Sequence, residues 1–144
     1  MKKRRTNFST LAVDTAVGYA TDERGSGIAY ARVRAAAGEH LLRVPFQVAR
    51  TSALRERRAG YAALTAISQA LHDWGVGRVR FALDDAALID DLTGRRDVPP
   101  GIVLPYVRLR CTLNQFDDFT LDGAAVESDL AQRARAEIAL NAAA

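Results

Sequence analysis

The strongest constraint on the fold is a run of three strand-like segments joined by short turn sequences. The segments are rich in small and β-branched apolar residues, and charged residues and glycines that favour turns separate them. The segments cover residues 10–17, 28–33 and 41–48, and the turns cover 22–27 and 37–39. Consecutive strands with short connections pair in antiparallel fashion, so a meander is expected. Pro45 predicts a sheet edge or a strand end for the third segment, because proline cannot donate to a central ladder.

A long amphipathic helix is predicted after the meander. Thr51 and Ser52 come directly before a run of Leu, Arg, Glu and Ala, where a hydroxyl group can cap the first free amides of a helix. Apolar residues recur at steps of three and four and share one face of this helix. They are Leu64, Ile67, Leu71 and Trp74. Gly75 marks the expected end of the helix.

The second half of the chain predicts strands alternating with helices. The expected elements are a buried strand at 79–83, a short helix at 86–92, a short strand at 119–121 and a closing helix at 127–140. Residues 103–116 fit either a strand or a helix, because their apolar positions match both periods. A meander followed by a helix and further strands predicts an α/β layer arrangement with a mixed sheet.

The composition is typical of one soluble globular domain. The chain has 144 residues, of which 49% are hydrophobic and 26% are charged, so a core can form and disorder is not expected. We expect a basic arm at 1–9, one domain at 10–140 and a frayed alanine-rich tail at 141–144. A single cysteine and the lack of an apolar stretch of roughly 18 residues predict a cytoplasmic protein. The net charge of +3 gives a mild preference for polyanions.

Acidic residues fall at the ends of several predicted elements. Asp14 lies in the first strand, Asp84 follows the fourth, and Glu56 lies in the first turn of the long helix. Asp129, with Glu127 as an alternative, begins the last helix. If the first and fourth strands are neighbours, these carboxylates converge at one end of the sheet. Carboxylates that close repel each other unless cations hold them, and Mg²⁺ prefers oxygen ligands, so a metal site is predicted.

The same acids also have ordinary structural roles. Asp84 and Asp85 fit the N-cap of the short helix, and acids at the start of the last helix are favoured by its dipole. Glu56 stands among Arg55, Arg57 and Arg58, which is typical of a solvated surface. Only the joint placement of the acids favours a functional site.

Five short motifs, in this order, resemble the ribonuclease H family of the short type without a basic protrusion. The motifs are Val-Asp-Thr-Ala at 13–16 with Gly-Ser-Gly-Ile-Ala-Tyr-Ala at 25–31, Ala-Gly-Tyr-Ala-Ala-Leu at 59–64, Val-Arg-Phe-Ala-Leu-Asp-Asp at 79–85, and Ser-Asp-Leu-Ala at 128–131. The resemblance runs from Leu11 to about Glu137. It implies a three-layer fold with a mixed five-stranded sheet flanked by helices, and it makes residues 103–116 a helix.

The chain departs from the family pattern at two motifs. The family's helix motif is Ala-Glu-Tyr-x-Ala-Leu, so the catalytic glutamate position holds Gly60 here. Glu56 stands one helical turn earlier on the same face and is the candidate replacement. The last family motif, Asp-x-Leu-Ala, is one residue shorter at Asp129, which leaves Glu127 as a competing ligand.

The resemblance implies an Mg²⁺- or Mn²⁺-dependent endonuclease that cuts the RNA strand of RNA/DNA hybrids by a two-metal mechanism. Asp14 would bridge both ions, Asp84 and Asp129 would each hold one, with Asp85 and Glu127 as alternates, and Glu56 would orient the first ion. The residues expected to contact nucleic acid are Arg57, Arg58, Thr51 and Ser52. The alternative function is a catalytically inactive domain that binds nucleic acid or a protein, and Gly60 motivates it.

Overall fold

The computed structural model describes residues 11–49, 54–95, 97–123 and 128–143. Three long strands come first: β1 (Ala12–Thr21), β2 (Ser26–Ala35) and β3 (Gly38–Gln47). The chain continues through α2 (Arg55–Asp73), β4 (Arg78–Leu83) and α3 (Ala86–Leu92). A 3₁₀ turn, η1 (Pro100–Ile102), leads into α4 (Val103–Leu113), which is followed by β5 (Asp118–Asp122) and α5 (Ser128–Ala143).

The five strands form one mixed sheet in the order β3-β2-β1-β4-β5. The first three pair as the antiparallel meander that the sequence predicts. β4 pairs in parallel with β1, and β5 pairs in parallel with β4. β3 is therefore an edge strand, which confirms the position expected for Pro45. The first and fourth strands are neighbours, as the metal-site hypothesis requires.

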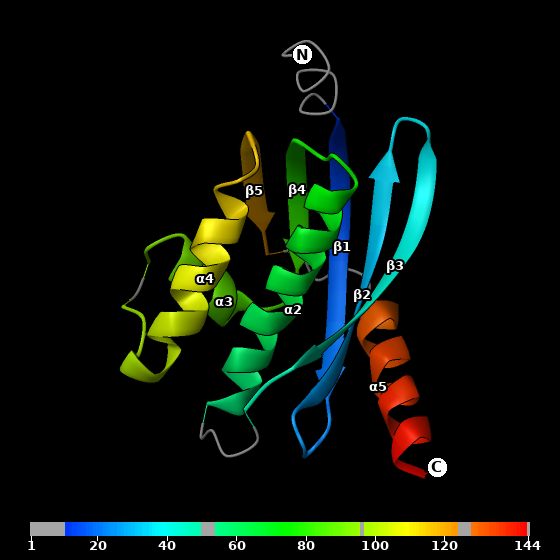
Figure 1. Ribbon diagram of the computed structural model, residues 1–144, viewed down its shortest axis with the longest axis vertical. Helices are drawn as coiled ribbons and strands as arrows, with labels where there is room; N and C mark the ends of the chain where they lie inside the picture. The colour runs from blue at the N-terminus through cyan, green and yellow to red at the C-terminus, as the bar shows by residue number, and fades with distance from the viewer. Residues whose placement is uncertain (1–10, 50–53, 96, 124–127, 144) are drawn as a thin grey trace.

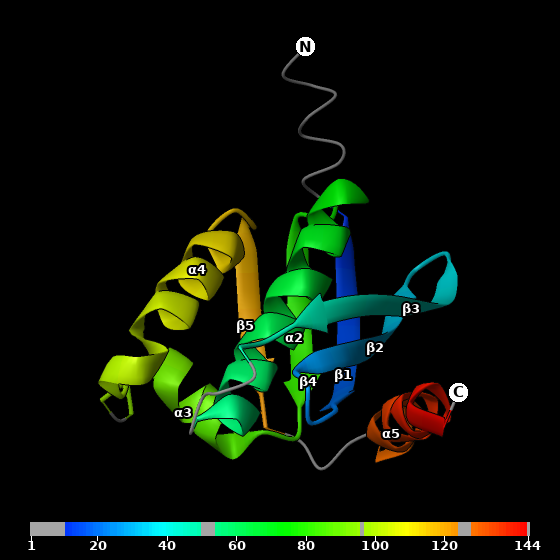
Figure 2. The same ribbon diagram turned by 60° about the horizontal axis from the view of Figure 1, so that its bottom comes forward.

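Helices cover both faces of this sheet, which gives three layers. Helices α2, α3 and α4 lie on one face and α5 lies on the other, as the turned view shows most clearly (Figure 1, Figure 2). The larger core lies between the sheet and α2, and includes Val13, Val17, Leu64 and Phe81. The smaller core lies under α5, and its buried members are Ala16, Ile28, Tyr30, Leu130 and Ala134. The predicted α/β fold with a mixed five-stranded sheet is confirmed.

The structure resolves the segment that the periodicity left open. Helix α4 spans Val103–Leu113, in agreement with the resemblance and against the strand-like alternation. Its buried residues are Leu109, Thr112 and Leu113, so the interior contact lies toward its C-terminal end.

Two details differ from the sequence expectations. Leu64, Ile67 and Leu71 are buried as predicted, but Trp74 is 45% exposed because the helix ends before it. Residues 141–143, expected to fray, continue α5. The predicted helix start at Thr51 and Ser52, and the basic arm at 1–9, lie outside the described residues. Within the described ranges, the helices are too short or too polar to cross a membrane.

Candidate functional site

The end of β4 places two acids beside the end of β1. Val17 and Leu83 are register partners in the parallel pair, and Asp84 and Asp85 follow Leu83 directly. Asp85 is the N-cap of α3, because its Oδ1 accepts a hydrogen bond from the amide of Leu88 at 3.1 Å. Asp84 is exposed. The helix-cap role that the sequence allowed for this pair is thus carried by Asp85.

Asp14 lies away from this end of the sheet. Its register partner on β4 is Arg80, four residues before Asp84, which corresponds to about 13 Å along a strand. Its neighbours Val13 and Val17 point into the core beneath α2, so Asp14 faces the α5 side. Its side chain is 63% exposed, and its Oδ1 lies 3.9 Å from Nε of Arg80. The structure therefore does not bring Asp14 to Asp84.

The remaining predicted ligands are also separated. Glu56 is exposed in the first turn of α2, on the α2 side of the sheet. Asp129 lies at the start of α5, on the opposite side, and accepts a hydrogen bond from Arg32 at 2.9 Å. Glu127 lies outside the described residues. In the part of the chain that the structure describes, no three His, Cys, Asp or Glu side chains are placed to share a metal ion.

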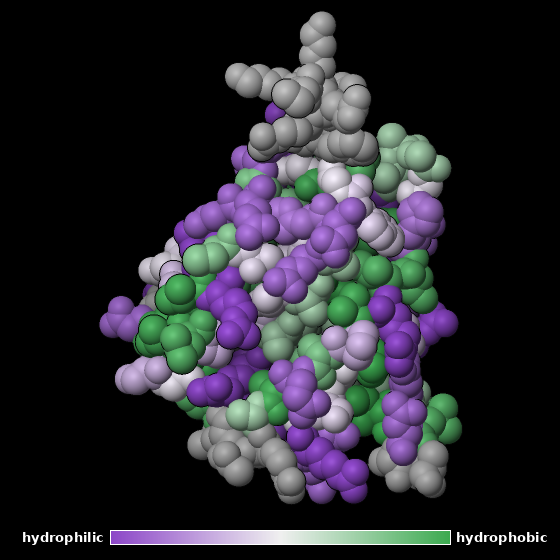
Figure 3. Space-filling model, in the orientation of Figure 1, coloured by the Kyte–Doolittle hydropathy of each residue, from purple (hydrophilic) through white to green (hydrophobic). Residues whose placement is uncertain are grey.

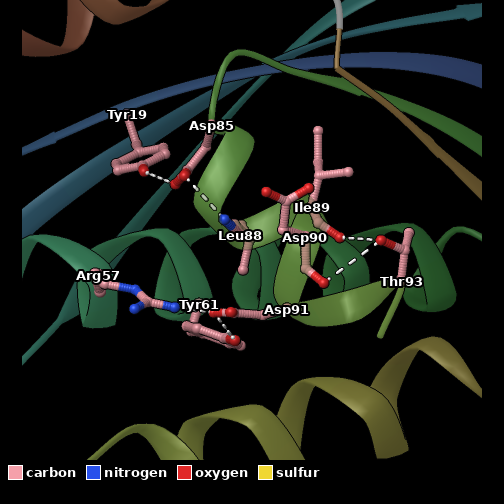
Figure 4. Close-up of polar contacts among 9 residues, drawn as sticks. All are labelled: Tyr19, Arg57, Tyr61, Asp85, Leu88, Ile89, Asp90, Asp91 and Thr93. Atoms are coloured by element: carbon pink, nitrogen blue, oxygen red, sulfur yellow. Dashed lines mark hydrogen bonds and ion pairs between the residues drawn. The ribbon is translucent and has the colours of Figure 1, made fainter. Parts of the chain in front are cut away.

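A tyrosine takes the position beside Asp85 that the sequence assigned to a carboxylate cluster. The hydroxyl of Tyr19, near the end of β1, donates a hydrogen bond to Oδ2 of Asp85 over 2.7 Å (Figure 4). Tyr19 faces the α2 side, like Val13 and Val17 before it. The sequence does not predict this role, because the first strand is expected to end at Val17. Continuing the alternation of inward-facing residues beyond Val17 would place Tyr19 on the same face.

Gly60 makes room for this contact. An added Cβ at Gly60 would lie 2.8 Å from Oδ2 of Asp85 and 2.9 Å from the hydroxyl of Tyr19. Both distances are below those that real Cβ atoms show. A glycine inside a helix costs about 1 kcal/mol relative to alanine, and the close approach of these two side chains explains why it is present. A side chain at the position that the resemblance gives to a catalytic glutamate would displace the Tyr19 hydroxyl and the Asp85 carboxylate.

The environment keeps the Tyr19 hydroxyl protonated. Burial raises the pKa of Tyr19, and the negative charge of Asp85 and the hydrogen bond to it raise this pKa further. Glu56 and Asp84 add smaller contributions in the same direction. Two of the predicted acids are thus close enough to act on Tyr19 electrostatically. A protonated hydroxyl is the form that can donate to Asp85.

A second tyrosine and aspartate pair lies at the other end of α3. Tyr61 donates to Oδ2 of Asp91 over 2.8 Å, and Arg57 forms an ion pair with the same oxygen (Figure 4). The side chain of Asp91 is completely buried. Of the residues expected to contact nucleic acid, Arg57 is thus engaged inside the protein, and Arg58 donates to the carbonyl of Gly101 at 2.6 Å. Thr51 and Ser52 are outside the described residues.

These residues do not fit a two-metal centre. Two Mg²⁺ ions require several converging carboxylate oxygens with free lone pairs. Here Asp85 accepts hydrogen bonds on both oxygens, Gly60 contributes no side chain, and Asp14 and Asp129 face the other side of the sheet.

A basic hollow lies on the half of the sheet that α5 leaves open. It has a volume of about 460 Å³ at the start of β1 and β4, and its charged lining residues are Asp14, Arg34, Arg78, Arg80 and Asp118. Asp14 stands between Arg34 on β2 and Arg80 on β4 in the strand register. The ion pair of Asp14 with Arg80 is part of this hollow.

Comparisons with known proteins identify the architecture. No family model and no curated protein matches the chain. Among solved structures, ribonuclease H1 from Halobacterium salinarum superposes with a TM-score of 0.70 at 22% identity, covering 90% of this chain and 98% of that one. The chain has a ribonuclease H-like fold.

Two further ribonuclease H structures agree with this fold. The N-terminal RNase H domain of rv2228c from Mycobacterium tuberculosis, solved as a fusion with maltose-binding protein, gives a TM-score of 0.68 at 17% identity. That match covers 94% of this chain and all of the other. LC11-RNase H1 in complex with an RNA/DNA hybrid gives 0.59 at 12% identity, covering 86% and 91%. Identities this low establish the ribonuclease H-like fold and leave the chemistry to the residues of the site.

Proposed function

We propose that this chain is a ribonuclease H-like domain that binds nucleic acid and does not cut it by the two-metal mechanism. The observation that carries the proposal is the hydrogen bond from Tyr19 to Asp85 against Gly60. A phenol hydroxyl satisfies the carboxylate that a cation would otherwise neutralise. The glutamate position of the resembled motif is a glycine, and a Cβ there would crowd the Tyr19 hydroxyl and the Asp85 carboxylate.

The fold and a basic surface support nucleic acid as the ligand. One structural neighbour is described in complex with an RNA/DNA hybrid. The hollow of this chain carries Arg78 and Arg80 on β4, and both residues are exposed. The basic sequence at 2–5 precedes β1, whose first residue, Ala12, lines the same hollow. Arginines on an open strand surface suit contacts to phosphates, which give salt-dependent affinity.

The opposite end of the sheet is less suited to a polyanion. Glu56, Asp84 and Asp85 all act on Tyr19 there, and each raises its pKa. Phosphates approaching this end would be repelled without bound cations. We therefore assign nucleic acid to the hollow at the start of β1 and β4, with RNA/DNA hybrid as the first ligand to test.

One observation favours a hydrolase as the second candidate. Glu56 and Asp84 both raise the pKa of Tyr19, so both acids act electrostatically on the hydroxyl that bonds to Asp85. If Tyr19 turned away, Asp85, Asp84 and Glu56 would be the remaining ligands for Mg²⁺ or Mn²⁺, and the chain would be an endonuclease. Binding and cleavage are separated by one assay.

The assay uses an RNA/DNA hybrid labelled on its RNA strand, with Mg²⁺ or Mn²⁺. Anisotropy measures binding, and a denaturing gel measures cleavage. The native chain is compared with Asp14→Asn, Glu56→Gln and Asp85→Asn. We expect binding that weakens steeply with salt, and intact RNA with every protein. Metal-dependent cleavage that Glu56→Gln and Asp85→Asn abolish would replace the proposal with the hydrolase.

Charge reversal tests the assigned surface. Arg78→Glu with Arg80→Glu should weaken hybrid binding at least about tenfold and reduce its salt dependence by about two ions. Arg133→Glu with Arg135→Glu on α5 makes an equal charge change at two other exposed positions and is the control. Equal losses in both proteins would argue against the hollow.

The same proposal places the protein in the cytoplasm, where RNA/DNA hybrids are available.

A further inference from the structure

A second groove lies on the other side of the molecule, between α2, α4 and the end of β3. It has a volume of about 560 Å³. Phe46, Leu104 and Pro105 provide apolar lining, and Arg58 and Arg108 are its charged residues. No aspartate or glutamate lines it. The described hydrogen bond of Arg58 ends on the neutral carbonyl of Gly101. The groove is therefore apolar and positively charged.

Exposed apolar side chains gather beside this groove on α4. Three large hydrophobic residues on its first turns are exposed: Val103 by 45%, Leu104 by 81% and Val107 by 48%. Figure 3 shows hydrophobic side chains over the N-terminal half of α4, next to hydrophilic ones. The helix Val103–Leu113 contains two arginines and no acid. An exposed apolar patch with a charged rim is typical of an interaction site.

We propose that this groove binds an acidic amphipathic segment of a partner protein. The apolar side of such a segment would pack on Leu104, Val107 and Phe46. Its carboxylates would face Arg58 and Arg108, which no acid of the groove lining neutralises. Helix-in-groove recognition uses apolar anchors spaced by three and four residues, and α4 and α2 provide the two walls that such a helix needs.

Charge argues against a second copy of this chain as the occupant. A two-fold contact along α4 would place the same patch against itself, so Arg108 and Arg110 would meet their own copies with no acid from α4 between them.

The aromatic side chains argue against nucleic acid in this groove. Single strands are held largely by bases stacked on exposed rings. Phe46 is partly buried and contacts the Tyr19 ring edge-to-face, while Tyr61 is 1% exposed and donates to Asp91. The groove offers aliphatic contacts and the guanidinium groups of Arg58 and Arg108. These suit leucine-like side chains and carboxylates better than nucleic-acid bases.

The test selects ligands from a displayed library of random peptides of about 15 residues, roughly four helical turns. The native chain is the target. Leu104→Ser is the counter-target, and Leu140→Ser is the matched control, because Leu140 is 72% exposed on α5. We expect enriched peptides that combine aspartate or glutamate with apolar residues three and four apart. Enrichment of basic peptides, or no enrichment over the Leu104→Ser chain, would overturn the proposal.

Affinities of one enriched peptide then test the groove residues. Leu104→Ser and Arg108→Glu should each weaken binding at least about tenfold, while Leu140→Ser and Arg135→Glu should leave it unchanged. A peptide with its acids replaced by lysine should bind the Arg108→Glu chain better than the native chain. Equal binding to all variants would contradict the assignment.

The other two occupants have their own signatures. A concentration-dependent dimer in sedimentation that Leu104→Ser dissolves would make a second copy the occupant. Single-stranded RNA binding lost in Arg108→Glu and kept in Arg78→Glu would make it nucleic acid. Either result would overturn the peptide proposal. Since nucleic acid is assigned to the hollow on the opposite face, failure of one proposal leaves the other standing.

Discussion

Asp85, the N-cap of α3, and Asp91, near the end of that helix, have different partners for their carboxylates. Each accepts a hydrogen bond from a tyrosine hydroxyl, from Tyr19 at 2.7 Å and from Tyr61 at 2.8 Å. Asp91 is completely buried and also has Arg57 as a counter-ion. Asp85 is partly buried, and its described hydrogen bonds come from neutral donors, the Tyr19 hydroxyl and the amide of Leu88.

The difference separates a pair inside the protein from a pair at the end of the parallel strands. Asp91 with Arg57 ties α3 to α2 inside the protein, where a buried charge needs a counter-charge. Asp85 stands where parallel strands end, the usual location of ligand sites in α/β sheets. There the Tyr19 hydroxyl donates a hydrogen bond to the Asp85 carboxylate, which a metal centre would pair with a cation. Gly60, which has no side chain, leaves room for the hydroxyl of Tyr19.

The largest predicted effect concerns the buried ion pair. Arg57→Ala removes the counter-ion of the buried Asp91 carboxyl group, and we expect a loss of about 3–5 kcal/mol in the free energy of unfolding. Denaturant unfolding of Arg57→Ala, Asp91→Asn and the double variant measures this. The double variant should lose less than the sum of the single losses. Additive losses would show that the two side chains do not interact.

Removing each tyrosine hydroxyl sharpens the comparison. Tyr61→Phe removes a hydrogen bond to a fully buried carboxylate and should cost about 1.5–3 kcal/mol of unfolding free energy. Tyr19→Phe should cost less, about 1 kcal/mol, because Asp85 is only partly buried and keeps its cap on α3. Thermal and denaturant unfolding of both variants test the order. A larger loss for Tyr19→Phe would make the Asp85 contact the structural one.

A methyl group at Gly60 tests how closely Tyr19 and Asp85 pack against this position. Gly60→Ala forces Cβ against Tyr19 and Asp85 and should cost about 1–3 kcal/mol, offset by about 1 kcal/mol of better helix propensity. In the Tyr19→Phe background the cost should shrink, because one of the two crowding atoms is gone. Denaturant unfolding of the native chain, the two single variants and the double variant gives the coupling free energy between Gly60 and Tyr19. Stabilisation by Gly60→Ala in the native chain would show that the contact is not tight.

A third tyrosine and carboxylate pair, on the α5 face, extends the comparison to the surface. Glu137 accepts hydrogen bonds from Tyr30 and Arg43, and the bond from Arg43 is the main cause of a pKa lowered from 4.5 to about 2. The folded state favours ionised Glu137, so this contribution to stability is complete above about pH 4.5. It is lost as the pH falls through about 2.

The measurement for this pair is unfolding free energy against pH. Glu137→Gln should flatten the acid part of the curve between these two values and change little at neutral pH beyond the lost ion pair. Since the pair is near the surface, this effect should be the smallest of the four. An unchanged acid slope in Glu137→Gln would show that other carboxylates dominate it.

Local spacing explains what the sequence could predict. Strand and helix identities, the edge position of Pro45 and the burial of Leu64, Ile67 and Leu71 depend on periodicity along the chain, which needs no knowledge of neighbours. The helix at 103–113 came from the resemblance, since its own pattern fits both periods. Burial there is confined to the end of the helix, which explains the weak periodic signal.

The site depends on information that no local pattern carries. The segment around Asp14 is apolar on both sides, so its sequence does not show which face the carboxylate takes, and pairing with β4 places it beside Arg80. Tyr19 belongs to β1 only because β2 extends the strand to Thr21 through antiparallel pairing. The contact that explains Gly60 thus joins three elements and required the fold.

The central claim is that Tyr19 occupies the position beside Asp85 that metal ions would need. The most direct test is crystallography of the native chain in millimolar Mn²⁺, with anomalous scattering to locate the metal. We predict no manganese peak beside Asp85, and a Tyr19 hydroxyl still bonded to its Oδ2. Two manganese ions bound by Asp85, Asp84 and Glu56, with Tyr19 turned away, would contradict the claim and support the metal-dependent hydrolase instead.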